Sequence, residues 1–406
     1  MVSNEPPPLP DAALDAALAP FGRSTMLPPQ AYTDPAVFAW EKRHLFGGWQ
    51  CVAMSADLSS PGDQRAVRLG ESSVVLARGQ DGVVRGFVNA CRHRAHELLP
   101  CASTGTAPVS NGRAITCPYH AWSYRLDGEL VAAPGYRDVP GFDPADYSLV
   151  GVRVAEWHGY LFADPSGAAV DLVDWLGDVE SRVAGHGLDR LVVAARHEYV
   201  VAANWKTITE NYQECYHCPS IHPQLCVVSP PDSGDNWEGS GAWVGGWLDL
   251  ADGAVTMSMD GHSDGLPIPG LPQWAATRVD YLGVFPNLLI SLHPDYVMTH
   301  RMVPLAADST WVECSWAFPP EAIAAPGFSP DYAVDFWHIT NSQDWAACES
   351  VQRGLASGAA RPGPLSPQED AVYQFVTMVA RSYRGLSAHL SPKERSWSAP
   401  HPSTPA

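Results

Sequence analysis

Residues 91–122 read CRHRAHELLPCASTGTAPVSNGRAITCPYHAW, and the motifs at the two ends of this stretch decide the fold. The first motif, CRHRAH, supplies Cys91 and His93; the second, CPYHAW, supplies Cys117 and His120. Two thiolates and two imidazoles are a suitable ligand set for zinc. A zinc finger, however, usually takes both cysteines from one turn and both histidines from another. One ligand of each kind from each motif therefore disfavours zinc.

The same order favours a [2Fe–2S] cluster in which two cysteines hold one iron and two histidines hold the other, the ligand set of a Rieske centre. Pro118 and Gly128 provide turn chemistry near the second motif. Backbone N–H groups in such turns can donate hydrogen bonds to the bridging sulfides.

The chain on both sides of these motifs predicts a small all-β domain over about residues 45–165. Short runs with alternating apolar residues, such as QRAVRL and SSVVLAR, are separated by Pro-Gly, Gly-Glu and Asp-Gly turn signals. Before them, DPAVFAWEKRHLFGGW predicts a helix that begins after Asp34. The first thirty residues are rich in Pro and Ala and predict a mobile arm.

The second half of the chain predicts an antiparallel sheet flanked by helices, an α+β arrangement. It opens with a strand and a helix starting at Asn204, continues with several strand-like runs, and closes with two helical stretches over 330–357 and 366–386. The segment 228–271 is dense in Gly, Pro, Asp and Trp, and we expect it to form a lid or a binding loop.

Composition narrows the class of protein. A chain of 406 residues is long enough for two domains. It contains no apolar run long enough to span a membrane and no secretion signal, so we expect a cytoplasmic protein without membrane contact. A formal charge of −19 argues against nucleic acid as a partner. Nine cysteines spread along the chain fit reduced thiols and metal ligands better than disulfides.

A second motif rich in possible ligands, ENYQECYHCPSIHP, covers residues 210–223. It is compatible with several kinds of site. Cys215 and Cys218 could form a redox CxxC pair, or could join His217 and Cys226 around zinc. Alternatively, Glu214, His217 and His222 could hold iron. If this segment is helical, Glu214 and His217 share a face and Pro219 breaks the helix, which lets His222 turn toward them.

The motifs CRHRAH, CPYHAW and LDG together resemble the Rieske domain of the Rieske non-haem iron oxygenases. The spacer between His93 and Cys117 holds 23 residues and is longer than is usual in that family, and its HRG is HRA here. By this resemblance, which covers roughly residues 35–385, His217, His222 and Asp344 bind a mononuclear iron as a facial triad. Cys215 and Cys218 are then expected to pack around the helix.

The resemblance also implies a role for Glu214 and a branch of the family. Glu214 would link His217 to the partner subunit's His120 and carry electrons between subunits. The motif ENYxECYHC is similar to the enzymes that oxidise quaternary ammonium compounds such as glycine betaine, carnitine, choline and stachydrine. Glu210 and Asn211 are expected to be hydrogen-bonding supports.

The implied fold is α+β: an N-terminal all-β Rieske [2Fe–2S] domain and a C-terminal catalytic domain of antiparallel sheet and helices, START/Bet v1-like with a helix-grip. The expected parts are a mobile arm (1–33), the Rieske domain with its leading helix (34–170), the catalytic mononuclear-iron domain (171–390) and a C-terminal tail (391–406).

The expected activity is O₂-dependent hydroxylation or N-demethylation of a small quaternary ammonium compound. The chain lacks a plant-type ferredoxin cysteine pattern and a G-x-G-x-x-G turn, so a separate flavin- or ferredoxin-type reductase must supply electrons. Family members assemble as head-to-tail homotrimers, and a closed ring is expected. Candidates for an aromatic substrate cage, each of which could instead fill the core, are Tyr212, Trp237, Trp243, Trp247, Tyr281 and Phe285.

Two alternatives stay open at this point. The same irons could hydroxylate or O-demethylate an aromatic or alicyclic substrate in a purely apolar pocket. The other alternative is a protein of another class, a Rieske electron carrier or a regulatory iron-binding protein. Iron content distinguishes them, because the oxygenase would contain three irons per chain and a carrier two.

Overall fold

The computed structural model describes residues 9–102 and 106–390. Within these ranges the chain forms two compact units, Glu41–Leu172 and Met1–Trp40 with Val173–Ala406, called here the smaller and the larger unit. The first eight residues of the predicted arm, three residues of the predicted spacer and the predicted C-terminal tail lie outside the described residues. No helix in the described part of the chain is both long and apolar enough to cross a membrane.

The smaller unit is built from antiparallel strands, as predicted. A seven-stranded sheet has the order β1-β10-β9-β4-β3-β2-β5, and a separate three-stranded sheet has the order β6-β7-β8. The strands are β1 (Gln50–Met54), β2 (Asp63–Leu69), β3 (Ser72–Arg78), β4 (Val84–Val88), β5 (Ser110–Asn111), β6 (Ile115–Thr116), β7 (Ser123–Tyr124), β8 (Leu130–Ala132), β9 (Gly151–Trp157) and β10 (Tyr160–Asp164). The CRHRAH motif follows β4 and the CPYHAW motif connects β6 to β7.

The larger unit is an antiparallel sheet with helices, which confirms the predicted fold class. Its seven strands have the order β11-β17-β16-β15-β14-β13-β12. They are β11 (Val192–Val201), β12 (Asp235–Asn236), β13 (Trp243–Asp249), β14 (Arg278–Val284), β15 (Leu288–Leu292), β16 (Val297–Ala306) and β17 (Ser309–Phe318). The stretch 228–271, expected to be a loop, thus contains two strands.

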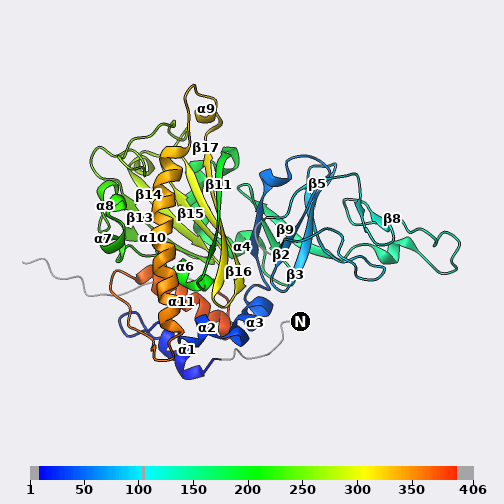
Figure 1. Ribbon diagram of the computed structural model, residues 1–406, viewed down its shortest axis with the longest axis horizontal. Coiled ribbons are helices and arrows are strands. Elements are labelled where there is room, and N and C mark those ends of the chain that lie inside the picture. Colours follow the sequence, from blue (N-terminus) through cyan, green and yellow to red (C-terminus); the bar gives the residue numbers. More distant parts are fainter. Residues whose placement is uncertain (1–8, 103–105, 391–406) are drawn as a thin grey trace, which may run out of the picture. The chain divides into compact units, whose positions relative to one another are not determined.

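The long helix α10 (Asp331–Leu355) lies across the sheet of the larger unit, with α6 (Trp205–Tyr212) and α11 (Asp370–Tyr383) near one of its ends (Figure 1). Between the sheet and α10 lies a continuous apolar core that includes Met298, Trp316 and Phe336. The shorter helices are α1 (Asp11–Ala17), α2 (Gln30–Thr33), α3 (Pro35–His44), α4 (Leu172–Leu176), α5 (Glu180–Val183), α7 (Cys218–Ile221), α8 (Pro223–Val228) and α9 (Pro320–Ile323).

Strand register decides which side chains of the larger unit face α10. Tyr281 of β14 lies opposite Gly246 on β13 and opposite Ser291 on β15, and the neighbouring pair is Asp280 with Trp247. Because successive residues of a strand point to opposite faces, Tyr281 and Trp247 lie on opposite sides of the sheet. Tyr281 packs against the core beneath α10.

The prediction of a mobile arm is wrong for residues 9–33, because these residues pack within the larger unit. Leu14 and Leu27 are buried, and so is Tyr32. The Tyr32 hydroxyl donates to the carboxylate of Glu210 at 2.8 Å, and its carbonyl accepts from the side chain of Gln352. The composition of residues 9–33 did not reveal these contacts, because Glu210 and Gln352 are distant from Tyr32 in the sequence. The following helix, α3, also differs from the prediction, since its residues up to Trp40 belong to the larger unit.

Glu210 is expected to make stability depend on pH. Burial raises its pKa to about 8, against the hydrogen bond from Tyr32 and the charge of Lys206, which lower it. An unfolded glutamate loses its proton near pH 4.3. The folded chain therefore binds the extra proton between about pH 5 and 8, and this contribution to stability is lost as pH rises through that window.

The variant Glu210→Gln keeps the shape of the side chain and removes its titration. The free energy of unfolding of the wild type is expected to fall relative to that of the variant as pH rises from 5 to 8. The difference should change by up to about 1.4 kcal/mol per pH unit. Denaturant unfolding at each pH measures this difference. Tyr32→Phe is the control, since it loses one hydrogen bond, worth about 1 kcal/mol, and keeps the titrating group. A constant difference between wild type and Glu210→Gln would contradict the prediction.

Candidate metal centres

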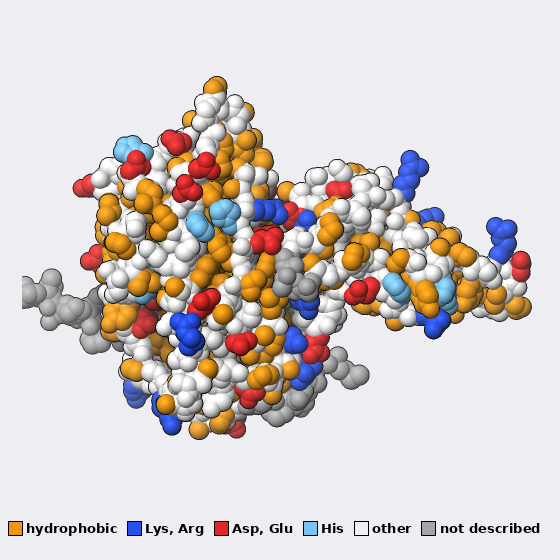
Figure 2. Space-filling view, in the orientation of Figure 1, with side chains coloured by type: hydrophobic (Ala, Val, Ile, Leu, Met, Phe, Trp, Pro, Cys, Tyr) orange, Lys and Arg blue, Asp and Glu red, His pale blue; other side chains and the backbone are white. Residues whose placement is uncertain are grey.

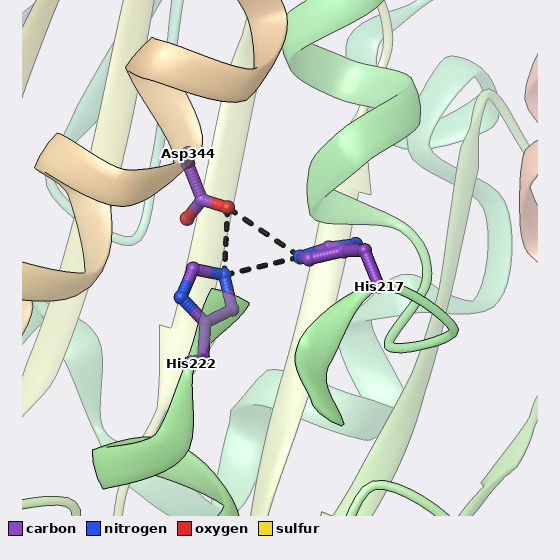
Figure 3. A group of neighbouring side chains, drawn as sticks. All are labelled: His217, His222 and Asp344. Carbon is purple, nitrogen blue, oxygen red and sulfur yellow. Dashed lines mark hydrogen bonds and ion pairs between the residues drawn. The ribbon is translucent and has the colours of Figure 1, made fainter. Parts of the chain in front are cut away.

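Three side chains from separate elements meet in the larger unit beside α10. His217 lies in the turn before α7, His222 lies between α7 and α8, and Asp344 lies on α10 (Figure 3). The Nε2 atoms of His217 and His222 are 3.1 Å apart. Asp344 Oδ1 lies 2.8 Å from His222 Nε2 and 3.4 Å from His217 Nε2. The structure thus brings together the three residues proposed from the sequence.

Hydrogen bonds at the far side of each imidazole determine which nitrogen faces the centre. His217 Nδ1 donates to Glu214 Oε1 at 2.6 Å, and His222 Nδ1 donates to Gln343 Oε1 at 2.7 Å. Both partners can only accept, so each Nδ1 carries the proton of a neutral ring. Each Nε2 then presents its lone pair toward Asp344.

The electrostatics of this group favour a cation between the three atoms. Although burial lowers the pKa of His217, hydrogen bonds with Asp344 and Glu214 raise it to about 9. Burial raises the pKa of Asp344, but the two imidazoles more than offset that effect, and its pKa is lowered. The carboxylates therefore stabilise positive charge at the position where the two Nε2 atoms converge.

The spacing fits an octahedral metal ion with these three ligands on one face. Ligand atoms at about 2.1 Å from a metal in neighbouring octahedral positions lie about 3 Å apart. Two histidines and one carboxylate are the facial triad of non-haem iron(II) oxygenases, and they leave the remaining positions open. A cavity of about 640 Å³ borders all three residues.

The local structure around His217 differs from the prediction in two ways. Helix α6 ends at Tyr212, so Glu214 and His217 meet across a turn and not along a helix, and Pro219 lies in the first turn of α7 instead of ending α6. Proline is well tolerated in a first turn because the N–H that it lacks has no helical partner there.

Cys215 and Cys218 were expected to pack as free thiols, and this was wrong. They are joined by a disulfide. The turn before α7 brings their Cα atoms to 4.9 Å, within the range that a disulfide spans. The other seven cysteines, all in the described part of the chain, are not joined in disulfides.

The smaller unit gathers the four residues of the first two motifs. The thiols of Cys91 and Cys117 are buried, whereas His93 is half-buried and His120 is exposed. The two imidazole rings are 4.8 Å apart. In both loops the cysteine N–H closes a turn, donating to the carbonyl of His96 in one and of Trp122 in the other.

These four residues fit a [2Fe–2S] cluster with an inner iron on sulfur and an outer iron on nitrogen. His93 Nδ1 is buried and, within the described residues, has no hydrogen-bond partner, while Nε2 of the same ring lies 3.4 Å from the Tyr136 hydroxyl. Nδ1 is therefore the nitrogen available to a metal. The Tyr124 hydroxyl lies 3.2 Å from the Cys91 sulfur, where it can donate to a thiolate.

The cavity beside the triad contains some of the aromatic residues proposed from the sequence and excludes others. Tyr212 and Tyr281 line it, and their rings are 5.9 Å apart. Trp247 borders it, but its ring packs against Trp237, and the Arg278 guanidinium lies 5.0 Å from its centroid. We expect such a ring to be unavailable to a substrate.

The other three candidates do not line the cavity, which corrects the prediction. Trp237 packs under Arg182, and the Trp243 indole N–H donates to Asp178. Both belong to the group of tryptophans near β13 that packs with Trp247, away from α10. Phe285 is buried against Trp205 and Phe375.

Sequence reasoning missed the lining residues on α10 and one support. Trp337 and Thr340 line the cavity, and Gln343 orients His222. Helical spacing contained the signal: Trp337, Thr340 and Asp344 are separated by three and four positions and so share one face of α10. Asn211, expected to be a support, lies 3.5 Å from His217 Nε2.

Comparisons with known proteins agree with this pair of centres. Residues 48–143 match the Rieske [2Fe–2S] domain, and residues 188–385 match the ring hydroxylating alpha subunit (catalytic domain). The glycine betaine monooxygenase oxygenase subunit of Chromohalobacter salexigens is 30% identical over 393 residues, covering 87% of this chain and 86% of its own. The carnitine monooxygenase oxygenase subunit of Escherichia coli K12 is 40% identical over 200 residues, covering 48% and 52%.

A solved structure of a quaternary ammonium Rieske monooxygenase, described for carnitine oxidation and inter-subunit electron transfer, shares the fold. Its TM-score is 0.76 at 26% identity, over 93% of this chain and 100% of that one. The resemblance, the fold class and the two cofactors expected from the sequence are therefore confirmed. The chain belongs to the Rieske non-haem iron oxygenases, as an oxygenase subunit with a [2Fe–2S] Rieske domain and a mononuclear-iron catalytic domain.

Proposed function

We propose that this chain is the oxygenase component of a Rieske monooxygenase that hydroxylates a small quaternary ammonium compound. The observation that carries the proposal is the lining of the cavity beside the triad. Its aromatic members include Tyr212, Tyr281 and Trp337, and its acidic members away from the triad include Asp232, Asp235 and Asp370. Among its described lining residues there is no lysine or arginine.

This lining suits a cation better than a neutral ring. A quaternary ammonium group has no N–H to donate, so it is held by aromatic faces and by surrounding negative charge, at about 0.5 to 2 kcal/mol per face. Burial raises the pKa of Asp370, and the nearby charge of Asp235 adds to that rise. Asp235 is exposed where it lines the cavity, so a cation can approach its carboxylate.

The residues of the chain have separate tasks in the proposed reaction. When bound, the Rieske cluster supplies electrons and the mononuclear iron supplies the centre at which O₂ is activated. Glu214 and Gln343 hold the imidazoles in one tautomer, and the aromatic residues place a methyl or methylene group of the substrate near the triad. Hydroxylation of an N-methyl group gives a hemiaminal, which collapses to formaldehyde and the demethylated amine.

Electron supply is part of the proposal. We propose that the chain forms a head-to-tail homotrimer, that a separate reductase refills the cluster, and that Glu214 joins His217 to the partner subunit's His120. Two features support the role of Glu214: its short hydrogen bond to His217 Nδ1, and a side chain that is only partly buried. A carboxylate in that position can accept hydrogen bonds from two imidazoles at once.

The first prediction from the proposed function concerns the charge of the substrate. Glycine betaine and choline, offered with a surrogate reductase, are compared with 3,3-dimethylbutanoate and 3,3-dimethylbutan-1-ol, which replace the ammonium nitrogen by carbon. We expect formaldehyde or betaine aldehyde from an ammonium compound. The carbon analogue of that compound should bind at least about tenfold more weakly. Equal binding within each pair, with turnover of an arene instead, would favour the aromatic or alicyclic alternative.

The second prediction concerns Tyr281. Tyr281→Leu removes an aromatic face, and we expect the dissociation constant of the ammonium substrate to rise about 2- to 30-fold, the equivalent of one cation–π contact. Tyr281→Phe retains the ring and is the matched control, expected to stay near wild type. Substrate titration of both variants measures this. Equal losses in both would show that the hydroxyl matters and the ring does not.

The third prediction separates iron binding from electron transfer. Asp344→Ala is expected to lower the iron content from three to two per chain while the Rieske spectrum persists, because the triad loses its charged ligand. Glu214→Gln is expected to keep most of its third iron yet slow oxidation of the Rieske cluster in a single turnover at least tenfold. Iron analysis and stopped-flow absorbance measure the two effects. Normal cluster oxidation in Glu214→Gln would remove Glu214 from the electron path.

A further inference from the structure

A continuous row of aromatic side chains leads from the iron cavity to the surface of the larger unit. It starts at Tyr212, which lines the cavity, and passes through His300, Trp345 and Tyr199 to His338. Successive ring centroids are 5.7, 6.1, 5.8 and 6.0 Å apart. We call these five residues the aromatic row. Each ring is in contact distance of the next, so an electron needs no long step to cross it.

At the outer end of the aromatic row, Tyr199 can lose a proton together with an electron, because His338 lies within hydrogen-bond distance of its hydroxyl. Tyr199 on β11 has its hydroxyl 2.8 Å from Nδ1 of His338 on α10, and His197 Nδ1 lies 3.3 Å away. Histidine side chains lie together on the exposed surface over α10 and β11 (Figure 2). Burial raises the pKa of Tyr199, so its phenol is protonated until it is oxidised. Once oxidised, a phenol is a strong acid, and the neighbouring imidazole can accept its proton.

The middle of the aromatic row also lies beside the iron site. Trp345 directly follows the iron ligand Asp344, and its indole N–H is buried with no hydrogen-bond partner in the described part of the chain. His300 is buried, and its Nε2 lies 3.1 Å from Asn341 Oδ1. Burial lowers the pKa of His300 to about 4, so this ring is neutral and adds no positive charge that would oppose oxidation of its neighbours.

We propose that the aromatic row is an oxidation route that protects the active site when oxygen is activated and no substrate is in place. Trp345 loses one electron to the oxidised iron centre, and Tyr199 replaces that electron. As Tyr199 is oxidised, its phenolic proton passes to His338 Nδ1, which leaves a neutral tyrosyl radical near the surface. A small reductant in solution, a thiol or ascorbate, then returns one electron, and His338 returns the proton to the phenolic oxygen.

This role goes beyond the proposed substrate chemistry and does not depend on it. It requires the iron centre with electrons from a reductase, O₂, the aromatic row and a small reductant in solution. Close packing alone explains why aromatic rings fill this part of the core. Packing does not require a phenol hydroxyl paired with an imidazole at the outer end, and that pair is the feature a radical carrier needs.

The test uses the whole enzyme with its three irons, a surrogate reductase and O₂, without substrate, and freeze-quenched samples are examined by EPR. We expect a neutral tyrosyl radical in the wild type, with a signal that narrows when the protein contains ring-deuterated tyrosine. Tyr199→Phe should lose this signal, and Trp345→Phe should reduce it at least tenfold. Trp274→Phe, an exposed ring outside the row, is the matched control and should leave it unchanged.

A second readout follows damage instead of the radical. After repeated substrate-free turnover, peptide mass spectrometry should find several-fold more oxygen added to cavity residues in Tyr199→Phe than in the wild type. Both row variants keep an aromatic ring, and their Rieske spectrum and iron content verify that they are folded. A wild type that consumes O₂ without any tyrosyl radical would overturn the proposal, as would a radical of equal size in Tyr199→Phe or Trp345→Phe.

Discussion

The catalytic domain depends on the convergence of two imidazole lone pairs and one carboxylate at a single point. His217, His222 and Asp344 come from three different elements, and none of them would hold this position unaided. Glu214 and Gln343 fix the ring orientation by accepting from each Nδ1, so the metal-facing nitrogen is decided by groups that would not touch the metal. Helix α10 supplies Asp344 and Gln343 as neighbours, which means that its packing on the sheet sets both a ligand and a support.

The two faces of the sheet in the larger unit divide the aromatic residues by task. On the face covered by α10, tyrosines and Trp337 surround the cavity. On the other side, Trp237 and Trp247 stack with Arg182 and Arg278, which are cations of the chain itself. The same physical preference of a cation for an aromatic face thus stabilises the fold on one side and, in our proposal, binds substrate on the other.

An iron that activates oxygen oxidises whatever lies beside it, so a site of this kind must place its substrate well and also limit damage to its own residues. The cavity and the aromatic row meet at Tyr212, which belongs to both. Its hydroxyl lies 2.8 Å from Ser291 Oγ, which positions the ring between the two features. The route from Tyr212 to His338 uses α6, β16, α10 and β11, so the elements that build the site also connect it to the surface.

The sequence by itself determined the ligand chemistry of this protein, because ligand types and their order along the chain are local facts. The two Cys-His motifs, the pair His217 and His222, and the alternating strands could all be recognised without coordinates; the choice of Asp344 came from family resemblance. Only the tertiary structure decided what depends on distant partners: strand register put Trp243 and Trp247 on the face of the sheet opposite Tyr281, and a turn joined Cys215 to Cys218. The N-terminal segment lacks a helical or strand pattern strong enough to predict its order, and it is held by contacts with residues far along the chain. Local composition describes what a segment can do alone, whereas burial depends on which surfaces meet it after folding.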